Sequence, residues 1–234
     1  MTTPPIPLLS ILVPVYNERR TVEAALEQIL ASDLPGVRRE LIVVDDGSTD
    51  GTAECLHGRQ WPAELRIVSH THNRGKGAAL RTALESAGGE YVTIMDADLE
   101  YDPGSLGSLV PPLLSGEAEV VYGVRGFQSH SAFSFWYVVG NKAVTMTANV
   151  LYNRWLADIM TCHKIMRTDL LRSLRLREDG FGIEPEITAR LLRAGAQIYE
   201  VPVRYSARRR AEGKKLTASD GLRVLITLAR CRVT

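Results

Sequence analysis

Two aspartates, Asp96 and Asp98, stand one residue apart directly after the apolar run at residues 91–95. In an extended segment, residues i and i+2 project to the same side, so we expect both carboxylates to face one point. Carboxylate oxygens are preferred ligands of hard cations such as Mg²⁺, and such a cation can hold a diphosphate. The pair predicts a cation site at the end of a strand, with a solvated turn as the alternative interpretation.

Polar residues also close two earlier apolar runs, at residues 14–18 and at residues 45–51. Because parallel strands present their carboxyl ends at one edge of a sheet, we expect both segments to converge there with residues 96–98. The second segment reads Asp-Asp-Gly-Ser-Thr-Asp-Gly, which is also a good turn and N-cap sequence. Taken alone, it leaves a structural role and a binding role equally open.

Short apolar runs alternate with helical patterns through the first half of the chain. We predict strands, buried on both faces of a parallel sheet, at residues 8–15, 41–44, 65–69, 91–95 and 119–122. Helical spacing lies between them, at residues 21–31, 52–57 and 76–87. This alternation predicts an α/β fold with a doubly wound, Rossmann-like and mostly parallel sheet flanked by helices.

The composition describes one globular domain. The 234 residues are 45% hydrophobic and 24% charged, which is enough for a single well-filled core. With 28 basic and 27 acidic residues the formal net charge is +1, which gives no general affinity for nucleic acid. Three widely spaced cysteines without a Cys-x-x-Cys pair predict neither a disulfide framework nor a zinc site, and they fit a reducing cytosol.

No run of about 18 apolar residues predicts a transmembrane helix, and the polar, proline-rich start does not resemble a signal peptide. Two apolar stretches, at residues 133–151 and 221–230, are nevertheless candidates for contact with a membrane surface, and the second also carries arginines. Such helices either pack on the sheet or lie in the interface plane. We therefore expect a cytoplasmic protein, either free or peripheral at the cytoplasmic membrane.

Four motifs, taken in order, resemble family 2 glycosyltransferases: residues 13–18 (VPVYNE), 44–52 (VDDGSTDGT), 73–80 (NRGKGAAL) and 96–100 (DADLE). Further segments are similar to the dolichyl- or polyprenyl-phosphate sugar transferase branch of that family, which includes dolichyl-phosphate mannose synthases. They are residues 96–103, 161–164, 181–188 and 212–215. The resemblance extends from about residue 8 to about residue 225, nearly the whole chain.

The resemblance implies an inverting enzyme with the glycosyltransferase A-type fold and a UDP- or GDP-sugar donor. Its single domain, residues 1–234, would divide into a nucleotide-binding half, 1–122, and an acceptor-binding half, 123–234. The second half would carry a mobile basic loop at about 205–217 and a C-terminal amphipathic helix. The implied reaction is an in-line displacement that moves the sugar to a polyprenyl or dolichyl phosphate.

Carried over residue by residue, the resemblance places Pro14, Tyr16, Glu18 and Asp46 around the nucleoside. Asp46 would accept a hydrogen bond from a ring N–H of the base, and it would not distinguish uracil from guanine because both present one. Lys76 opens a helix after a glycine-rich loop, so it is expected either near the nucleotide or as a solvated helix-start lysine.

The resemblance assigns the metal to three acidic residues of a DXD motif. Asp98 would be the main ligand, Asp96 would contact the metal or the donor ribose, and Glu100 would complete or support the metal's ligand set. Mg²⁺ or Mn²⁺ suits carboxylate and phosphate oxygens and would neutralise the charge that develops on the leaving nucleoside diphosphate.

The second half of the chain supplies cations. Arg125 resembles the residue that grips the acceptor phosphate, and the resemblance makes it part of the catalytic set with Asp98. Arg208, Lys214 and Lys215 resemble the segment that closes over the donor and clamps its diphosphate.

Glu184 and Glu186 flank Pro185 at a predicted helix start. In the family this region lies beside the transferred sugar, so either glutamate is a candidate for contact with sugar hydroxyls. Acidic groups in the first turn also interact favourably with the helix dipole. The sequence leaves the two roles open.

Two departures from the family pattern bear on the acceptor. Ser131 follows His130 where relatives have arginine, and Lys142 stands where relatives often have arginine, which loses bidentate geometry. A small soluble hydroxyl acceptor is therefore the alternative to a lipid phosphate. A hydroxyl would need a general base, and Asp158 is the candidate, with a structural hydrogen-bonding role as its alternative.

Two other classes fit less well. A nucleotidyltransferase also pairs an α/β sheet with metal-binding carboxylates, but the glycine-rich activation loop typical of that class is absent after residues 13–18. A noncatalytic nucleotide-binding module would bind nucleotide without turnover, and the intact Asp96, Asp98, Arg125 and Arg208 argue against it.

Overall fold

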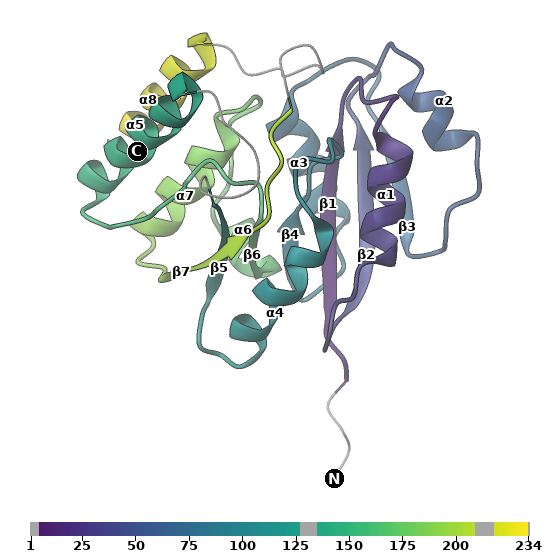
Figure 1. The fold of residues 1–234 in the computed structure, drawn as a ribbon, viewed down its shortest axis with the longest axis horizontal. Coiled ribbons are helices and arrows are strands. Elements are labelled where there is room, and N and C mark those ends of the chain that lie inside the picture. Colours follow the sequence, from purple (N-terminus) through teal and green to yellow (C-terminus); the bar gives the residue numbers. More distant parts are fainter. Residues whose placement is uncertain (1–4, 127–134, 209–217, 234) are drawn as a thin grey trace.

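A seven-stranded sheet in the order β3-β2-β1-β4-β6-β5-β7 forms the centre of the molecule (Figure 1). The structure is a computed structural model, and it describes residues 5–126, 135–208 and 218–233, without the side chains of residues 218–220. The strands are β1 (Leu8–Val15), β2 (Arg38–Asp45), β3 (Leu65–Ser69), β4 (Tyr91–Ile94), β5 (Val120–Arg125), β6 (Lys164–Arg167) and β7 (Ile198–Val203).

One strand runs against the others. β6 pairs antiparallel with both β4 and β5, whereas every other pair of neighbours is parallel. The carboxyl ends of β1, β2, β4 and β5 therefore meet at one edge of the sheet. Because β6 is reversed, it presents its first residue, Lys164, at that same edge, opposite Tyr122 of β5.

Helices cover both faces of the sheet, with α1 on the near face and α3 on the far face in Figure 1. The helices are α1 (Val22–Ala31), α2 (Thr52–His57), α3 (Lys76–Ser86), α4 (Leu106–Leu114), α5 (Phe135–Tyr152), α6 (Thr168–Ser173), α7 (Ile183–Arg193) and α8 (Ala218–Val233), with a short 3-10 helix at Pro103–Ser105.

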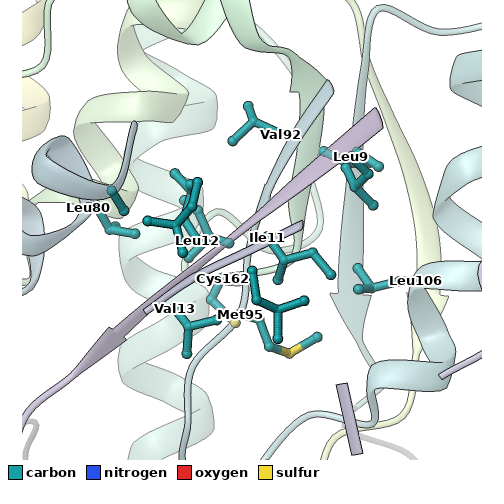
Figure 2. Close-up of a cluster of buried hydrophobic side chains, with 14 of the residues drawn as sticks. Leu9, Ile11, Leu12, Val13, Leu80, Val92, Met95, Leu106 and Cys162 are labelled. Carbon is teal, nitrogen blue, oxygen red and sulfur yellow. The ribbon is translucent and has the colours of Figure 1, made fainter. Parts of the chain in front are cut away.

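Strand β1 lies inside the sheet and is apolar on both faces. Figure 2 shows Leu12 directed toward Leu80 of α3, while Leu9 and Ile11 lie on the side of Leu106 from α4. All of these side chains are buried. Both faces of the strand exclude water, which is why its apolar residues are consecutive rather than alternating, and its one polar residue, Ser10, is buried with its hydroxyl donating to Glu40 at 2.6 Å.

A second apolar cluster joins α5, α7 and α8 at one side of the molecule, at the left of Figure 1. The Tyr152 hydroxyl donates to the carbonyl of Leu228 at 2.8 Å and links α5 to α8. Within the ranges that the structure describes, no helix combines the length and the apolarity needed to cross a bilayer.

The strands expected at residues 8–15 and 65–69 and the helix expected at 52–57 have the predicted bounds. The strand expected at 119–122 instead runs from Val120 through Gly123 to Arg125, because its pairing with β7 continues to that residue. β6 and β7 were not predicted. β6 has only four residues and begins with a lysine, and β7 contains a proline and is mostly half-exposed.

The start of α3 is closed by a loop from the second half of the chain. The carbonyl of Asp179 accepts the N–H groups of Gly77 at 2.6 Å and Ala78 at 3.2 Å, which would otherwise lack partners at a helix N-terminus. The neighbouring Glu178 side chain accepts from Thr227 of α8 at 3.1 Å and pairs with Arg230 of the same helix. This loop therefore connects α8 to the first turn of α3.

We expect Gly75→Ala to reduce the free energy of unfolding more than Gly116→Ala. Gly116 has φ +75°, where alanine costs about 1–2 kcal/mol of backbone strain, whereas Gly75 has φ +96° with ψ 156°, a conformation that is essentially restricted to glycine and costs about 1–3 kcal/mol. A Cβ at Gly75 would lie 2.3 Å from the Asp179 carbonyl oxygen, whereas at Gly116 nothing lies within 4 Å. The clash should add about 1–3 kcal/mol to the loss in Gly75→Ala. The free energy of unfolding of both variants is measured by urea denaturation. Equal losses would show that the loop yields freely.

Candidate functional site

A cavity of about 410 Å³ lies at the carboxyl edge of the sheet. Its size is in the range of small-molecule sites. Of the residues singled out in the sequence, it brings together Pro14, Tyr16, Glu18, Asp46, Lys76, Asp96, Asp98, Glu100, Arg125, Glu184 and Arg208. Asp158 and Glu186 do not line it, and Lys214 and Lys215 lie outside the described residues.

The loops after β1 and β2 are fastened to each other by side chains of the Asp-Gly-Ser-Thr-Asp-Gly segment. The N–H of Asn17 donates to Ser48 Oγ and the N–H of Glu18 donates to Thr52 Oγ1, both at 2.9 Å. The Asn17 side chain in turn accepts from the N–H of Thr49 at 2.8 Å. This segment is therefore largely structural, and of its residues Asp46 lines the cavity.

Asp46 is buried and holds the glycine-rich loop in place. Its carboxylate accepts from the N–H groups of Arg74 at 2.9 Å and Gly75 at 2.7 Å. Its Oδ1 also lies 2.7 Å from His70 Nδ1, and His70 Nε2 lies 2.9 Å from Thr82 Oγ1. A carboxylate has about four acceptor sites, so these contacts leave room for a hydrogen bond from a ligand at the cavity.

Asp96 and Asp98 do not share an extended segment, so the premise from which we expected both carboxylates to face one point is wrong. β4 ends at Ile94, and residues 97 and 98 form a turn in which Asp98 accepts from the N–H of Glu100 at 3.0 Å. Asp96 pairs with Lys76 at 2.8 Å, and Asp98 lies 3.3 Å from Arg208. Both carboxylates still line the same cavity.

Lys76 stands between two carboxylates, Asp96 and Glu184, the second of which is 3.1 Å from its ammonium nitrogen. Burial alone would lower the pKa of Lys76, but the charges of Asp96 and Glu184 outweigh it and raise that pKa. The lysine is therefore a fixed positive charge in the cavity rather than a solvated residue of the helix start.

The guanidinium of Arg208 meets three carboxylates from two segments, the loop after β1 and the loop after β4. It donates two hydrogen bonds of 3.0 Å to Glu18, and it lies 3.3 Å from Asp98 and 3.9 Å from Glu100. The Glu100 carboxylate also accepts from the N–H of Arg208 at 3.0 Å and from the Tyr205 hydroxyl at 2.5 Å. Glu100 is thus the anchor of residues 205–208, and Arg208 is the cation within this acidic group.

Arg125 ends β5 and is buried against Asp158. Two nitrogens of its guanidinium donate to the two Asp158 oxygens at 2.6 and 2.8 Å, and further bonds reach the Tyr137 hydroxyl at 2.9 Å and Asn141 Oδ1 at 3.0 Å. Burial would raise the pKa of Asp158, but Arg125 outweighs it and holds that pKa below its usual value. This pairing makes Asp158 a poor general base and a positioning partner of Arg125.

The two candidate glutamates of α7 have different surroundings. Glu184 lines the cavity, while Glu186 is fully buried and accepts from the backbone N–H groups of Arg177 and Glu178 and from Arg190 Nε at 2.8 Å. Glu186 therefore shapes the loop before α7 and cannot meet a sugar in this arrangement. Burial would raise the pKa of Glu184, but Lys164 and then Lys76 outweigh it and lower that pKa.

Several residues at the site were given no individual role from the sequence, although Cys162 and Lys164 lie in the motif at residues 161–164. Tyr137, Cys162 and Tyr205 line the cavity, and Lys164 lies behind it. Tyr137 stands in an aromatic stretch that was considered for its membrane contact, and Tyr205 follows β7 without any motif in the sequence. Long-range pairing alone gives Tyr205 its role, through an isolated bridge to Tyr101. Ser131, a departure from the family pattern, lies outside the described residues.

Known proteins resemble this chain over much of its length. The family model described as glycosyl transferase family 2 matches residues 10–175. A dodecaprenyl-phosphate galacturonate synthase of Rhizobium johnstonii is 31% identical over 88% of this chain and 61% of its own length. A dolichol-phosphate mannosyltransferase of Pyrococcus furiosus is 26% identical over 88% of this chain and 58% of its own length. The chain thus spans about three fifths of the length of these curated relatives.

Among solved structures, glucosyl-3-phosphoglycerate synthase of Mycobacterium tuberculosis, in complex with Mn²⁺, UDP and glucosyl-3-phosphoglycerate, has a TM-score of 0.74. The alignment covers 97% of this chain and 81% of that one at 24% identity. This likeness supports the fold, a single domain of the glycosyltransferase A type.

We expect the free energy of unfolding to decrease as the pH is lowered below about 6.5, because of His163. This ring is buried, stacks on Tyr101 at 4.3 Å between centroids, and leaves Nδ1 without a hydrogen-bond partner among the described residues. Burial and, after it, the Lys164 charge lower the pKa of His163 from 6.5 to about 3. Between these values the unfolded chain binds a proton that the folded chain does not, so stability is lost as pH falls below about 6.5.

The measurement is urea denaturation between about pH 5 and pH 8, where His163 should contribute a slope of up to about 1.4 kcal/mol per pH unit below pH 6.5. In His163→Leu the slope of the free energy of unfolding against pH should be smaller by that amount, because leucine does not titrate. Parallel curves for the two proteins would contradict a neutral buried histidine.

Proposed function

The chain belongs to glycosyl transferase family 2, and on that premise we propose that it transfers a sugar, with inversion, from a UDP- or GDP-sugar to a polyprenyl or dolichyl phosphate. The observation that carries the proposal is the single cavity at the carboxyl edge of the sheet. It gathers the acidic turn Asp96–Asp98, the cations Lys76 and Arg208, and Arg125 into one space of about 410 Å³.

The donor half of the proposal assigns Pro14, Tyr16 and Asp46 to the nucleoside. Asp46 is already fixed by the loop it holds, so it would present a preorganised acceptor to a ring N–H of uracil or guanine. Lys76 and Arg208 would meet the diphosphate, for which Glu18, Asp98 and Glu100 would have to release the Arg208 guanidinium. Lys214 and Lys215 remain candidates for the same clamp by resemblance alone.

The charge of the cavity fits a divalent cation, Mg²⁺ or Mn²⁺. Among its described lining residues six are carboxylates and three are lysine or arginine, so a diphosphate would add to an excess of negative charge. No group of three or more histidine, cysteine or acidic side chains is close enough to hold an ion, within the described ranges. Asp98 and Asp96 would therefore hold the metal together with phosphate oxygens. The metal would supply charge neutralisation at the leaving diphosphate.

The acceptor half of the proposal depends on Arg125. A phosphate acceptor is anionic near neutral pH and attacks the anomeric carbon without help from a strong base, so positioning and charge stabilisation carry the reaction. The pairing of Asp158 with Arg125 fits this requirement, since the site then needs no free base there. Asp158 would keep the Arg125 guanidinium in one orientation.

The test is release of nucleoside diphosphate from a panel of UDP- and GDP-sugars, with and without Mn²⁺, given either a polyprenyl phosphate or phosphoglyceric acid. We expect one donor to be consumed only with metal and polyprenyl phosphate. Asp98→Asn should lower kcat by about 10²–10³, because a charged group at the leaving diphosphate is lost. The matched control is Asp102→Asn, an exposed aspartate outside the cavity, which should leave kcat unchanged.

Release that requires phosphoglyceric acid instead would overturn the lipid acceptor in favour of a soluble one. No release from any combination would overturn the transferase proposal and favour a noncatalytic nucleotide-binding module.

A lipid acceptor also requires contact with a bilayer, and we propose that α5 and α8 provide it. The exposed apolar residues of α5 recur along one stripe, with Trp136 78% and Val150 73% exposed. The exposed apolar residues of α8 form a second stripe that includes Leu222 and Ile226, flanked by the exposed Arg223. Apolar stripes with arginines beside them are typical of helices that lie in the membrane interface.

We expect the protein to sediment with vesicles that contain anionic phosphatidylglycerol. The double variant Trp136→Ser, Ile226→Ser should reduce the bound fraction severalfold, because it removes apolar area that would be buried in the membrane interface. Leu114→Ser on α4 is the control, since it removes an exposed leucine outside both stripes. An unchanged bound fraction in the double variant would contradict docking through these helices.

A further inference from the structure

Four side chains of alternating charge run from the interior of the sheet to the cavity. In order they are Lys164, Glu184, Lys76 and Asp96, and we name them the charge chain. Lys164 Nζ lies 2.6 Å from Glu184 Oε2, Glu184 Oε1 lies 3.1 Å from Lys76 Nζ, and Lys76 Nζ lies 2.8 Å from Asp96. The last three residues line the cavity, and Lys164 does not.

Lys164 is fully buried at the first position of β6. Its ammonium donates to the carbonyl oxygens of Ile159, at 3.2 Å, and Thr161, and to Glu184 Oε2. An ammonium has three donors, so these three acceptors fix its direction completely. Charges are buried in this way only when they are paired, because an unpaired one loses its hydration without replacement.

The two oxygens of Glu184 are in different situations. Oε2 accepts from Lys164, whereas Oε1 is in ion-pair distance of Lys76 but has no hydrogen-bond partner among the described residues. Glu184 is only 3% exposed, and it lines the cavity. A carboxylate oxygen has two acceptor sites, so Oε1 can still accept from a ligand hydroxyl beside its ion pair with Lys76.

We propose that Lys164 is a positioning residue for the donor sugar, holding Oε2 of Glu184 so that Oε1 is presented to a sugar hydroxyl. The inference rests on the proposed glycosyl transfer and adds to it a residue that never touches substrate. Lys76 alone cannot do the same, because it also pairs with Asp96. Without Lys164 the Glu184 carboxylate is drawn toward Lys76 and away from the sugar.

The test compares the binding of a nucleoside diphosphate with that of its sugar nucleotide, using the donor that the panel identifies, by calorimetry with Mn²⁺. The ratio of the two Kd values isolates contacts made by the sugar. In Lys164→Gln and Lys164→Met the ratio of diphosphate Kd to sugar-nucleotide Kd should fall about tenfold, the loss expected for one hydrogen bond to a charged acceptor. Affinity for the diphosphate itself should change little.

Glu184→Gln should lower the ratio by the same factor, and adding Lys164→Gln to it should lower it no further, since both act on one contact. Arg167→Gln is the matched control, because it removes an exposed cation from the other end of β6 and should leave the ratio unchanged. If Lys164→Met fails to fold, Lys164→Gln keeps a donor toward the two carbonyl groups and decides the question.

A ratio that stays at the wild-type value in the Lys164 variant, or that falls together with diphosphate affinity, would overturn this inference and leave the proposed function intact. A wild-type protein that consumes no donor would overturn both.

Discussion

Crowding of negative charge at one edge of the sheet is the constraint on which the rest of the site depends. Six carboxylates line the cavity, and mutual repulsion would drive them apart if each lacked a partner inside the protein. Asp46 is satisfied by backbone N–H groups, Asp96 by Lys76, Glu184 by Lys164, and the remaining three by Arg208. Much of the local architecture consists of these internal partners.

The surroundings of Arg125 differ from those of Arg208, because Arg125 pairs with a carboxylate outside the cavity lining. Arg125 is neutralised by the buried carboxylate of Asp158, which also accepts from the N–H of Met160, and the Arg125 guanidinium is oriented by Tyr137 and Asn141. The Tyr137 hydroxyl also lies 3.1 Å from that of Tyr205, which donates to Glu100. A continuous path of hydrogen bonds therefore links Arg125 to the acidic group around Arg208, so the charges at the two ends of this path are coupled.

The sequence predicted the half of the fold that is local and the half of the site that lies on consecutive loops. β1, β3 and α2 follow from apolar runs and turn residues nearby in the chain, and the motifs containing Asp46 and Asp96 come directly after two further apolar runs, those of β2 and β4. β6 and Tyr205 were not predicted, because a short reversed strand and a single bridge acquire their meaning from partners far away in sequence. The roles of Asp158 and Glu186 stayed open between catalysis or sugar contact and structure, because a sequence does not display the donors that occupy their carboxylates.

The loop that carries Glu178 and Asp179 bears on how far the chain can be divided. The Glu178 side chain is held by α8, near the end of the described chain. The Asp179 carbonyl accepts from the first turn of α3, beside Lys76. A fragment that ended before α8 would lose the partners of Glu178 and with them part of the support for the start of α3 beside the cavity. The two halves proposed from the sequence, residues 1–122 and 123–234, therefore depend on contacts with each other.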